Sequence, residues 1–543
     1  MNKNSFNFLD RINSLDKNQN QLFDLIVIGG GITGAGILLD ASSRGLKTLL
    51  LEKKDFASGT SGRSTKLIHG GLRYLKEFEF NLVRKVGKER AIVYNNAPQL
   101  IIPQKLLLPI YNNGNFKKWQ LTFALNIYDW LAGVKKNERK KILNKKKTIA
   151  KEPILKNEGL NGAGFYSEYR TDDARLTLEV IKTALNYKAE PYNYIKVTKI
   201  NKSKNLFHVT AFDTVNQLSF EFKAKQLVNA TGPWTDELRK TNNPNSTKSI
   251  CLSKGVHIVL KHKDFPIQNP VYFDAIDNRM CFAIPRNNCT YVGTTDTLHT
   301  KSNKREPGSN LNDINYIIDS INYRFDVPEI KLNAVISSWA GLRPLIEERG
   351  KKTSEISRKD EIIIAENRMI SIAGGKLTGY RLMANKVIDL VIKNLNRTEN
   401  CITSKIKLSG SDNITTLNVA EIKKKISNQL LDLKLESNET DYLFHNYGSQ
   451  VNNILSLFKK NNYSAIVEAE VHFCLENENL YFPLDFFLRR TSKLYYSPET
   501  IEKEIELVAP IFKKKLNLSQ EKFNVLIAQL LDYKHSLTNF QDD

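Results

Sequence analysis

Gly29, Gly31 and Gly34 stand near the start of the chain in the pattern Gly-x-Gly-x-x-Gly, directly after the apolar run 24–28. In this pattern the first glycine permits a tight turn, the second lets the backbone approach a pyrophosphate, and the third lets a helix pack closely against a strand. A helix that begins at the turn also points free N–H groups and its positive dipole end at a phosphate. The glycines therefore predict a dinucleotide-binding turn.

Glu52 ends the next apolar run, 47–52, which follows a predicted helix over 34–44. At the end of the second strand of such a unit, a carboxylate can accept hydrogen bonds from both hydroxyl groups of a ribose, and it disfavours a 2′-phosphate. The order of strand, turn, helix and strand predicts a βαβ unit with parallel strands. These features alone fit either NAD or FAD.

Two later strand-and-turn segments favour FAD over NAD. Residues 226–230 run into the turn 231–233, and residues 369–373 run into the turn 374–376, which a predicted helix over 377–395 follows. The N-terminus of that helix could place N–H groups against the N1–C2=O edge of an isoalloxazine ring, where they would stabilise the negative charge of a reduced flavin. The spacing predicts a nucleotide-binding domain assembled from separated pieces of the chain.

The block 60–75 reads Thr-Ser-Gly-Arg-Ser-Thr-Lys-Leu-Ile-His-Gly-Gly-Leu-Arg-Tyr-Leu and is the most specific motif in the chain. It resembles the FAD-dependent glycerol-3-phosphate dehydrogenases, which belong to the D-amino-acid-oxidase-like flavoprotein superfamily. The resemblance runs in order from about residue 24 to residue 381 and continues near the C-terminus, in the segments 229–234, 254–257, 292–296, 341–344, 374–378 and 485–491. Two features depart from the family: a polar N-terminal extension, and Gly62-Arg63, where small residues are more usual.

The resemblance implies a quinone-linked oxidoreductase with non-covalently bound FAD. It implies oxidation of sn-glycerol 3-phosphate to dihydroxyacetone phosphate, with a hydride passing from C2 to flavin N5 and electrons passing on to a membrane quinone. It also implies a cytoplasmic protein that is peripherally attached to the inner face of the cell membrane, and it leaves a homodimer open. A glycerol-3-phosphate oxidase that uses oxygen shares the fold and the substrate residues, and an amine or amino-acid oxidase is a third alternative.

Three regions supply the predicted contacts to the cofactor. They are the first part of the block 60–75, which we call the flavin loop, the glycine turn 29–34, and the later turns near residues 231 and 375. Val197 is predicted to hold the adenine edge through its backbone, although an ordinary strand residue is the alternative there. The FAD-binding residues that we predict are Gly29, Gly31, Gly34, Glu52, Thr60, Ser61, Thr65, Lys66, Leu67, Val197, Ala230, Thr231, Gly232, Gly375, Lys376, Leu377 and Thr378.

For the substrate, a phosphomonoester calls for arginines, which bind phosphate in a bidentate manner. Within the resembling motifs we assign Arg73 and Arg358 to the phosphate and Tyr74 to the substrate site. We place Arg343, a further substrate-binding residue, and Lys376 near the reacting oxygen. For each arginine the alternative is an ordinary ion pair.

An imidazole suits the removal of the hydroxyl proton near neutral pH. We predict His257 as the proton acceptor, with His69 as the runner-up. Asp296 is a weaker candidate, and the alternative for it is a purely structural role in fixing a loop. A histidine between apolar residues is more often a satisfied core residue, which is the competing interpretation of His257.

The chain carries a net charge of +22, from 80 basic and 58 acidic residues. Since lysines occur in every segment, we interpret this charge as a compositional bias and expect no nucleic acid as a partner. No apolar run is long enough for a membrane span, and the N-terminus does not resemble a signal peptide. The five cysteines show no CxxC spacing, so we expect neither a disulfide framework nor a metal site.

Residues 116–134 combine aromatic and apolar side chains, and a run of lysines and arginines follows them. Aromatic rings beside lysines are typical of a helix that lies in the surface of an anionic membrane. A core helix of the substrate domain, followed by a solvated loop, fits the same residues. The sequence leaves both interpretations open.

The predicted helices and strands that position these residues indicate an α/β fold. It consists of a polar extension over residues 1–22, followed by three domains. A discontinuous, Rossmann-like FAD-binding domain takes residues 23–76, 173–235 and 342–400. An α+β substrate-binding domain takes residues 77–172 and 236–341. From residue 401 glycine becomes scarce and apolar residues recur at helical spacing, so residues 401–543 are predicted to form an all-helical domain.

Overall fold

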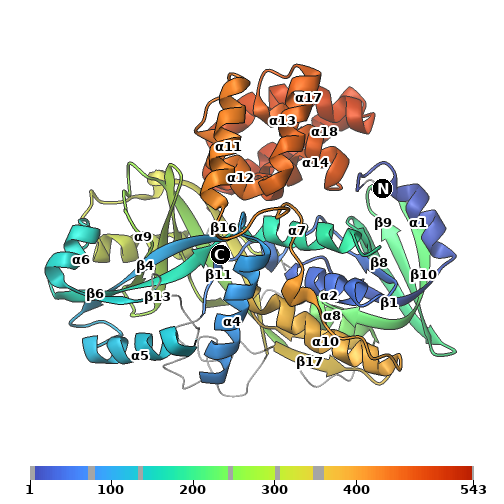
Figure 1. Ribbon diagram of the computed structural model, residues 1–543, viewed down its shortest axis with the longest axis horizontal. Helices are drawn as coiled ribbons and strands as arrows, with labels where there is room; N and C mark the ends of the chain where they lie inside the picture. Colours follow the sequence, from blue (N-terminus) through green and yellow to red (C-terminus); the bar gives the residue numbers. More distant parts are fainter. Residues whose placement is uncertain are drawn as a thin grey trace.

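The computed structural model describes residues 6–70, 80–131, 139–242, 249–299, 306–346 and 360–540. Two β-sheets lie next to each other, and a group of C-terminal helices covers them from one side (Figure 1). This arrangement confirms the predicted α/β fold with a helical C-terminal part.

The first sheet is built around β1 (Leu22–Ile28), whose last four residues are buried. It pairs in parallel with β10 (Leu218–Asn229) on one side and with β2 (Thr48–Leu51) on the other. β18 (Ile370–Gly374) and β7 (Glu190–Tyr192) extend the parallel part. Antiparallel strands complete the sheet: β8 (Ile195–Ser203), β9 (Leu206–Asp213) and β17 (Asp360–Ile364). Because parallel strands end at one edge, the turns after β1, β2, β10 and β18 meet there.

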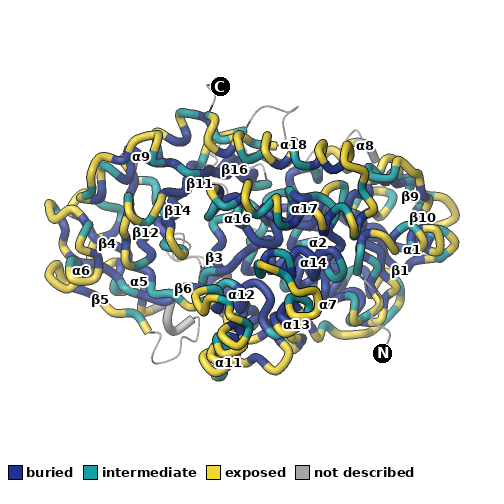
Figure 2. Tube along the Cα trace, turned by 90° about the horizontal axis from the view of Figure 1, so that it is seen from above, coloured by how far each residue is buried: buried dark blue, intermediate teal, exposed yellow. Residues whose placement is uncertain are grey.

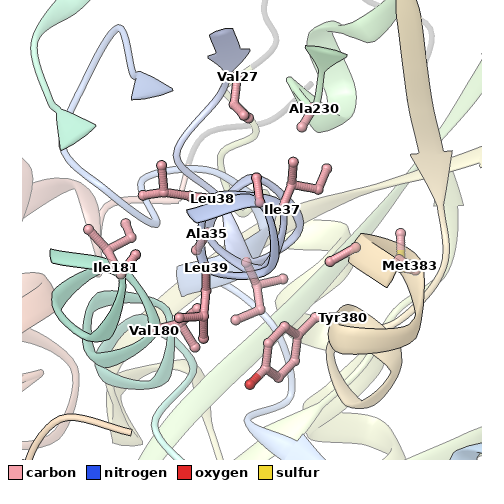
Figure 3. Close-up of a cluster of buried hydrophobic side chains, with 14 of the residues drawn as sticks. Val27, Ala35, Ile37, Leu38, Leu39, Val180, Ile181, Ala230, Tyr380 and Met383 are labelled. Atoms are coloured by element: carbon pink, nitrogen blue, oxygen red, sulfur yellow. The ribbon is translucent and has the colours of Figure 1, made fainter. Parts of the chain in front are cut away.

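Helix α2 (Ile32–Ser43) packs on this sheet and is buried along most of its length (Figure 2). Its side chains lie between those of α7 (Asp173–Leu185) and α10 (Tyr380–Asn394), as Figure 3 shows. A Cβ atom on Gly36 would stand 2.9 Å from the Tyr380 ring, so a glycine is needed for α10 to approach this closely. The predicted βαβ unit is therefore confirmed, with two helices from distant parts of the chain beside its own.

The second sheet is mostly antiparallel and comes from segments between those of the first sheet. Its longest pairing joins β11 (Ile250–Lys261) to β16 (Val335–Ile346) and sets His257 opposite Trp339. The other strands are β3 (Leu67–Ile68), β4 (Ile102–Tyr111), β5 (Lys141–Asn144), β6 (Leu160–Arg170), β12 (Val271–Asp274), β13 (Met280–Arg286), β14 (Cys289–Gly293) and β15 (Thr297–Leu298). The helices of these segments are α4 (Phe80–Asn96), α5 (Lys118–Leu131), α6 (Lys145–Lys151) and α9 (Leu311–Arg324).

The C-terminal helices form their own apolar core. The longer ones are α11 (Val419–Asp432), α12 (Glu439–Tyr447), α13 (Val451–Asn461), α14 (Ile466–Asn477), α17 (Ile501–Leu516) and α18 (Gln520–Ser536). Buried ion pairs attach them to the rest of the molecule: Arg175 of α7 pairs with Glu478 at 2.7 Å, and Arg490 pairs with Asp55 at 2.6 Å. Among the described residues, no helix is long and apolar enough to cross a membrane.

Part of the N-terminal extension is folded against the molecule. Helix α1 (Arg11–Gln19) packs on β10, and Arg11 is buried with its guanidinium 2.6 Å from the carboxylate of Asp213. Phe8 stacks on Tyr481 of the helical domain, with ring centroids 4.4 Å apart. The extension therefore links the first sheet to the C-terminal helices, which its polar composition did not indicate.

Candidate functional site

A cleft opens at the edge where the parallel strands of the first sheet end. The residues that follow β1, β2, β10 and β18 line it, together with the loop 58–63 and part of β8. Of the predicted FAD-binding residues, the structure brings these together in the lining: Gly29, Gly31, Glu52, Thr60, Ser61, Val197, Ala230, Thr231, Gly232, Gly375, Lys376 and Leu377. Ligands of open α/β sheets bind in this position.

The glycines of the turn are required by close backbone contacts. Gly29 has φ +110°, and a Cβ atom there would stand 2.6 Å from the carbonyl oxygen of Ala230. A Cβ atom on Gly34 would overlap the carbonyl oxygen of Gly29. At Gly31, a Cβ atom would meet the Ser61 hydroxyl at 3.0 Å, and this hydroxyl accepts a hydrogen bond from the Ile32 N–H at the start of α2. The turn thus keeps open a cradle that side chains would fill, which fits a bound pyrophosphate.

Glu52 is fixed by its own backbone surroundings. The N–H groups of Gly30 and Lys54 donate to its two carboxylate oxygens at 2.7 and 2.8 Å. Burial raises the pKa of Glu52, and these two hydrogen bonds oppose the rise. Each oxygen has a further lone pair, so the carboxylate can still accept hydrogen bonds from the hydroxyl groups of a ribose.

Positive side chains that the sequence analysis did not select also line the cleft, namely Lys53, Lys54, Arg63 and Lys196. Glu306 pairs with Lys54 and lies 3.9 Å from the Arg63 guanidinium. Burial, together with the charges of Arg63 and Lys53, lowers the pKa of Lys54 to about 8. This local positive charge suits a pyrophosphate. Since lysines occur throughout the chain, no signal in the sequence distinguished these residues.

A second cavity is continuous with the cleft. The two share six lining residues: Thr60, Arg63, Pro344, Gly375, Lys376 and Leu377. The second cavity is also lined by His69, His257, Arg343, Thr65, Leu67 and Thr378. The four residues that we predicted for the chemistry, namely His69, His257, Arg343 and Lys376, therefore line one space. It lies at the end of the cleft near the turn 374–378, which we call the flavin-side turn.

His257 is 2% exposed and is held on two sides. Its Nε2 atom lies 3.0 Å from the Thr65 hydroxyl, and its ring stacks on Trp339 with centroids 4.8 Å apart and an angle of 12° between the planes. Burial lowers the pKa of His257 well below its usual value, and the charges of Arg343 and Lys66 lower it further. The imidazole is therefore neutral at neutral pH and able to accept a proton.

Arg343 is held at the cavity by residues that follow β14. Its Nη2 atom donates to the Thr294 hydroxyl at 2.9 Å, and its Nη1 atom pairs with Asp296 at 3.4 Å. Gly255 makes room for this arrangement, because a Cβ atom there would overlap the guanidinium. Asp296, our weaker candidate for the proton acceptor, thus contacts Arg343, and Arg343 lines the second cavity.

Of the predicted cofactor-binding residues, Lys66 and Gly34 line neither the cleft nor the second cavity. The Lys66 ammonium group is buried in an ion pair with Asp173. His69 lines the second cavity through a loop that is tied to the flavin-side turn, where the N–H group of His69 donates to the Thr378 hydroxyl at 3.2 Å. Gly34 lies in the first turn of α2, where it allows the close approach of the Gly29 carbonyl oxygen. The predicted phosphate ligands Arg73 and Arg358 and the predicted substrate-binding residue Tyr74 lie outside the described residues.

Comparisons with known proteins agree with this geometry. Residues 24–380 match the family described as FAD dependent oxidoreductase, and residues 401–523 match the C-terminal domain of alpha-glycerophosphate oxidase. The chain is 43% identical over 542 residues to the aerobic glycerol-3-phosphate dehydrogenase of Bacillus subtilis, covering 96% of this chain and 97% of that one. It is also 43% identical to the corresponding protein of Staphylococcus aureus over 514 residues, covering 92% of each.

Solved structures show the same similarity. The glycerol-3-phosphate dehydrogenase of Bacillus halodurans complexed with FAD superposes with a TM-score of 0.85 at 37% identity, over 99% of this chain and 100% of that chain. The L-alpha-glycerophosphate oxidase of Mycoplasma pneumoniae, with FAD bound, shares the fold at 18% identity, with a TM-score of 0.55 over 70% of this chain and 96% of that chain.

We expect Gly34→Ala to abolish cofactor binding, because the added methyl group would overlap the Gly29 carbonyl and force the turn apart. The measurement is the flavin absorbance that remains with the purified protein per mole of chain. Gly308→Ala is the matched control, since Gly308 is exposed and a Cβ atom there would meet nothing within 4 Å. Equal flavin content in the two variants would contradict the proposed role of the turn.

Proposed function

Because this chain belongs to the FAD-dependent glycerol-3-phosphate dehydrogenase and oxidase family, we propose that it oxidises sn-glycerol 3-phosphate to dihydroxyacetone phosphate and passes the electrons to a membrane quinone. The observation that carries the proposal is the second cavity, where His257, Arg343 and Lys376 surround the end of the cofactor cleft. An anionic substrate with a secondary hydroxyl group matches two fixed cations and a neutral imidazole.

FAD, when bound, supplies the hydride acceptor for C2 of the substrate. The chain's own residues position the substrate and handle the proton. Arg343, fixed by Thr294 and Asp296, places positive charge beside the oxygen on which negative charge develops. Lys376 adds a second positive group from the flavin-side turn, and His257 takes the hydroxyl proton. In this proposal Arg73 and Arg358 bind the phosphate group and Tyr74 also contacts the substrate. These three residues lie outside the described part of the chain.

A glycerol-3-phosphate oxidase is the second candidate, since the C-terminal match is to a domain described from an alpha-glycerophosphate oxidase. The two functions differ in what reoxidises the flavin. Two relatives that are 43% identical over nearly the whole chain are named dehydrogenases and not oxidases, which is why we place the quinone first.

The decisive experiment follows the visible flavin spectrum of the purified protein during anaerobic titration with glycerol 3-phosphate, and then measures reoxidation. We expect bleaching of the flavin band, followed by faster reduction of a soluble quinone than release of peroxide in air. Glycine serves as the control substrate, for an amino-acid oxidase. Absence of bleaching would exclude glycerol 3-phosphate as the substrate. Rapid peroxide release without quinone reduction would show that the protein is an oxidase.

Arg343→Ala should lower kcat/KM for glycerol 3-phosphate by about 10²-fold or more, on the order of 3 kcal/mol, because the charge beside the reacting oxygen is lost. Steady-state kinetics measure the loss of kcat/KM. The flavin absorbance of the variant measures the bound FAD, which should be unchanged. Arg397→Ala is the control, since Arg397 forms a surface ion pair with Glu399. Unchanged kinetics for Arg343→Ala would exclude Arg343 from the site.

Helix α5 supports attachment to a membrane surface. Trp119 and Phe123, one turn apart, are 68% and 63% exposed, while Leu121 and Leu125 on the other face are buried against Gly164. Exposed lysines occur close by in the sequence, at positions 117 and 118 at the start of the helix and at 141, 145 and 146 after it. One face of the helix packs on the second sheet, as the core-helix interpretation expects, and the exposed aromatic rings of the other face support our proposal of a membrane contact. Helix α5 lies at the lower edge in Figure 1, on the opposite side from the C-terminal helices.

We expect the double variant Trp119→Ser, Phe123→Ser to bind vesicles that contain an anionic phospholipid about tenfold less than the wild type, because its apolar contact with the interface is lost. Co-sedimentation with the vesicles measures the bound fraction. The control is Leu417→Ser, Leu431→Ser, which removes exposed apolar side chains from the helical domain. Equal losses in both double variants would argue against α5 as the contact.

A further inference from the structure

Two contacts hold the ring of His257, and both lead back to one short turn of the flavin loop, Ser64–Lys66. The Thr65 hydroxyl in this turn lies 3.0 Å from His257 Nε2. Trp339, which stacks on the other side of the ring, donates from its indole N–H to the Ser64 carbonyl oxygen at 3.2 Å. The position of the imidazole is therefore set relative to this turn.

The turn itself is anchored on both sides of Thr65. Asp173, at the start of α7, accepts hydrogen bonds from the Ser64 N–H at 2.9 Å and from the Ser64 hydroxyl at 2.6 Å, and it pairs with the Lys66 ammonium. The Tyr291 hydroxyl donates to the Thr65 carbonyl oxygen at 3.2 Å. With its two neighbours and its own carbonyl group fixed, Thr65 presents its hydroxyl group in one place.

Thr65 also lines the second cavity, beside His257 and Arg343. Among the described residues, His257 Nδ1 has no hydrogen-bond partner and is buried, so the Thr65 hydroxyl is the contact that distinguishes the two ring nitrogens. A neutral imidazole carries one N–H and one lone pair, so its Nε2 atom can form a hydrogen bond with a hydroxyl group in either tautomer. A threonine hydroxyl can take part as donor or as acceptor, whereas a valine of the same shape can do neither.

We propose that Thr65 is a positioning residue, whose hydroxyl group fixes the orientation in which His257 accepts the proton of the substrate. The inference rests on the proposed function. In that reaction the O–H bond of the substrate breaks and its proton passes to the lone pair of the imidazole, while the C2–H bond breaks and its electron pair leaves as a hydride to FAD. Thr65 neither gains nor loses a proton in the overall step.

The test compares Thr65→Val with Thr65→Ser in anaerobic stopped-flow reduction of the flavin by glycerol 3-phosphate. Removal of the hydroxyl should lower the limiting rate of reduction by about 10- to 100-fold, with FAD content and the substrate concentration for half-saturation within about threefold of wild type. Thr65→Ser keeps the hydroxyl and should restore most of the rate. If Thr65→Val is recovered without FAD, Thr65→Ala replaces it, because it also removes the hydroxyl and adds no bulk.

A double-mutant cycle with His257→Gln separates positioning of the histidine from a general effect on the loop. If Thr65 acts through His257, the loss of its hydroxyl should change the rate by less than about twofold in the His257→Gln background. Additive losses, equal rates for the valine and serine variants, or a wild-type rate for Thr65→Val would each overturn the inference. Wild-type flavin that glycerol 3-phosphate does not bleach would instead overturn the proposed function, and a wild-type rate for His257→Gln would overturn the role of His257.

Discussion

The buried ion pair between Lys66 and Asp173 is the interaction on which both cavities depend. Both side chains are almost fully buried, and removing two charges from water costs several kcal/mol per ion unless the remaining polar atoms are satisfied. They are satisfied here: Asp173 also accepts hydrogen bonds from Ser64 and from the N–H group of Ala174, and the Lys66 ammonium donates to the Gly62 carbonyl oxygen at 3.3 Å. Such a pair has low energy in only one arrangement of the loop. It therefore fixes the loop that borders the cofactor cleft on one side and the second cavity on the other.

Residues next to Asp173 in the chain connect the two sheets to the C-terminal helices. Asp172 caps the start of α7 by accepting a hydrogen bond from the Arg175 N–H at 3.2 Å, and it also accepts one from the Ser492 hydroxyl of the helical domain at 2.8 Å. Asp172 pairs with Arg286 of the second sheet at 3.1 Å. A few residues along the chain, Arg175 is paired with Glu478. The C-terminal helices thus lie against the back of the flavin loop and contribute to its geometry without lining either cavity.

The parts of the fold that the sequence could predict are those that local patterns determine. Apolar strands, a glycine turn and helical spacing after residue 401 indicated the parallel sheet, the nucleotide site and the helical domain, because each depends on residues close together in the chain. The turn could be predicted in detail, since Gly29 and Gly34 are required by backbone contacts that any such βαβ unit makes. The positions of His257 and Arg343 beside one cavity came from the family resemblance, because nothing local links β11 to β16.

What the sequence could not predict are partnerships between distant residues. Lys66 stands in a motif that indicates cofactor binding, yet its partner, Asp173, follows more than a hundred positions later and draws the ammonium away from the cleft. The polar composition of residues 1–22 gave no sign that Arg11 is buried against Asp213. Likewise, a single tryptophan such as Trp339 has no local pattern that marks it as the stacking partner of His257. In each case the pairing is created by packing of elements from separate parts of the chain.

The charges around His257 explain how a weakened base can serve an anionic substrate. Burial lowers the pKa of the imidazole, and the charges of Arg343 and Lys66 lower it further, so in the free protein it is a poor proton acceptor. The positive charge of Arg343 is also what an anionic substrate requires. A bound phosphate monoester brings negative charge into the same cavity and offsets the repulsion that an imidazolium meets there, since like charges disfavour protonation and opposite charges favour it. The base therefore becomes stronger when the substrate is in place, and substrate binding and proton removal are coupled through the charge of the cavity itself.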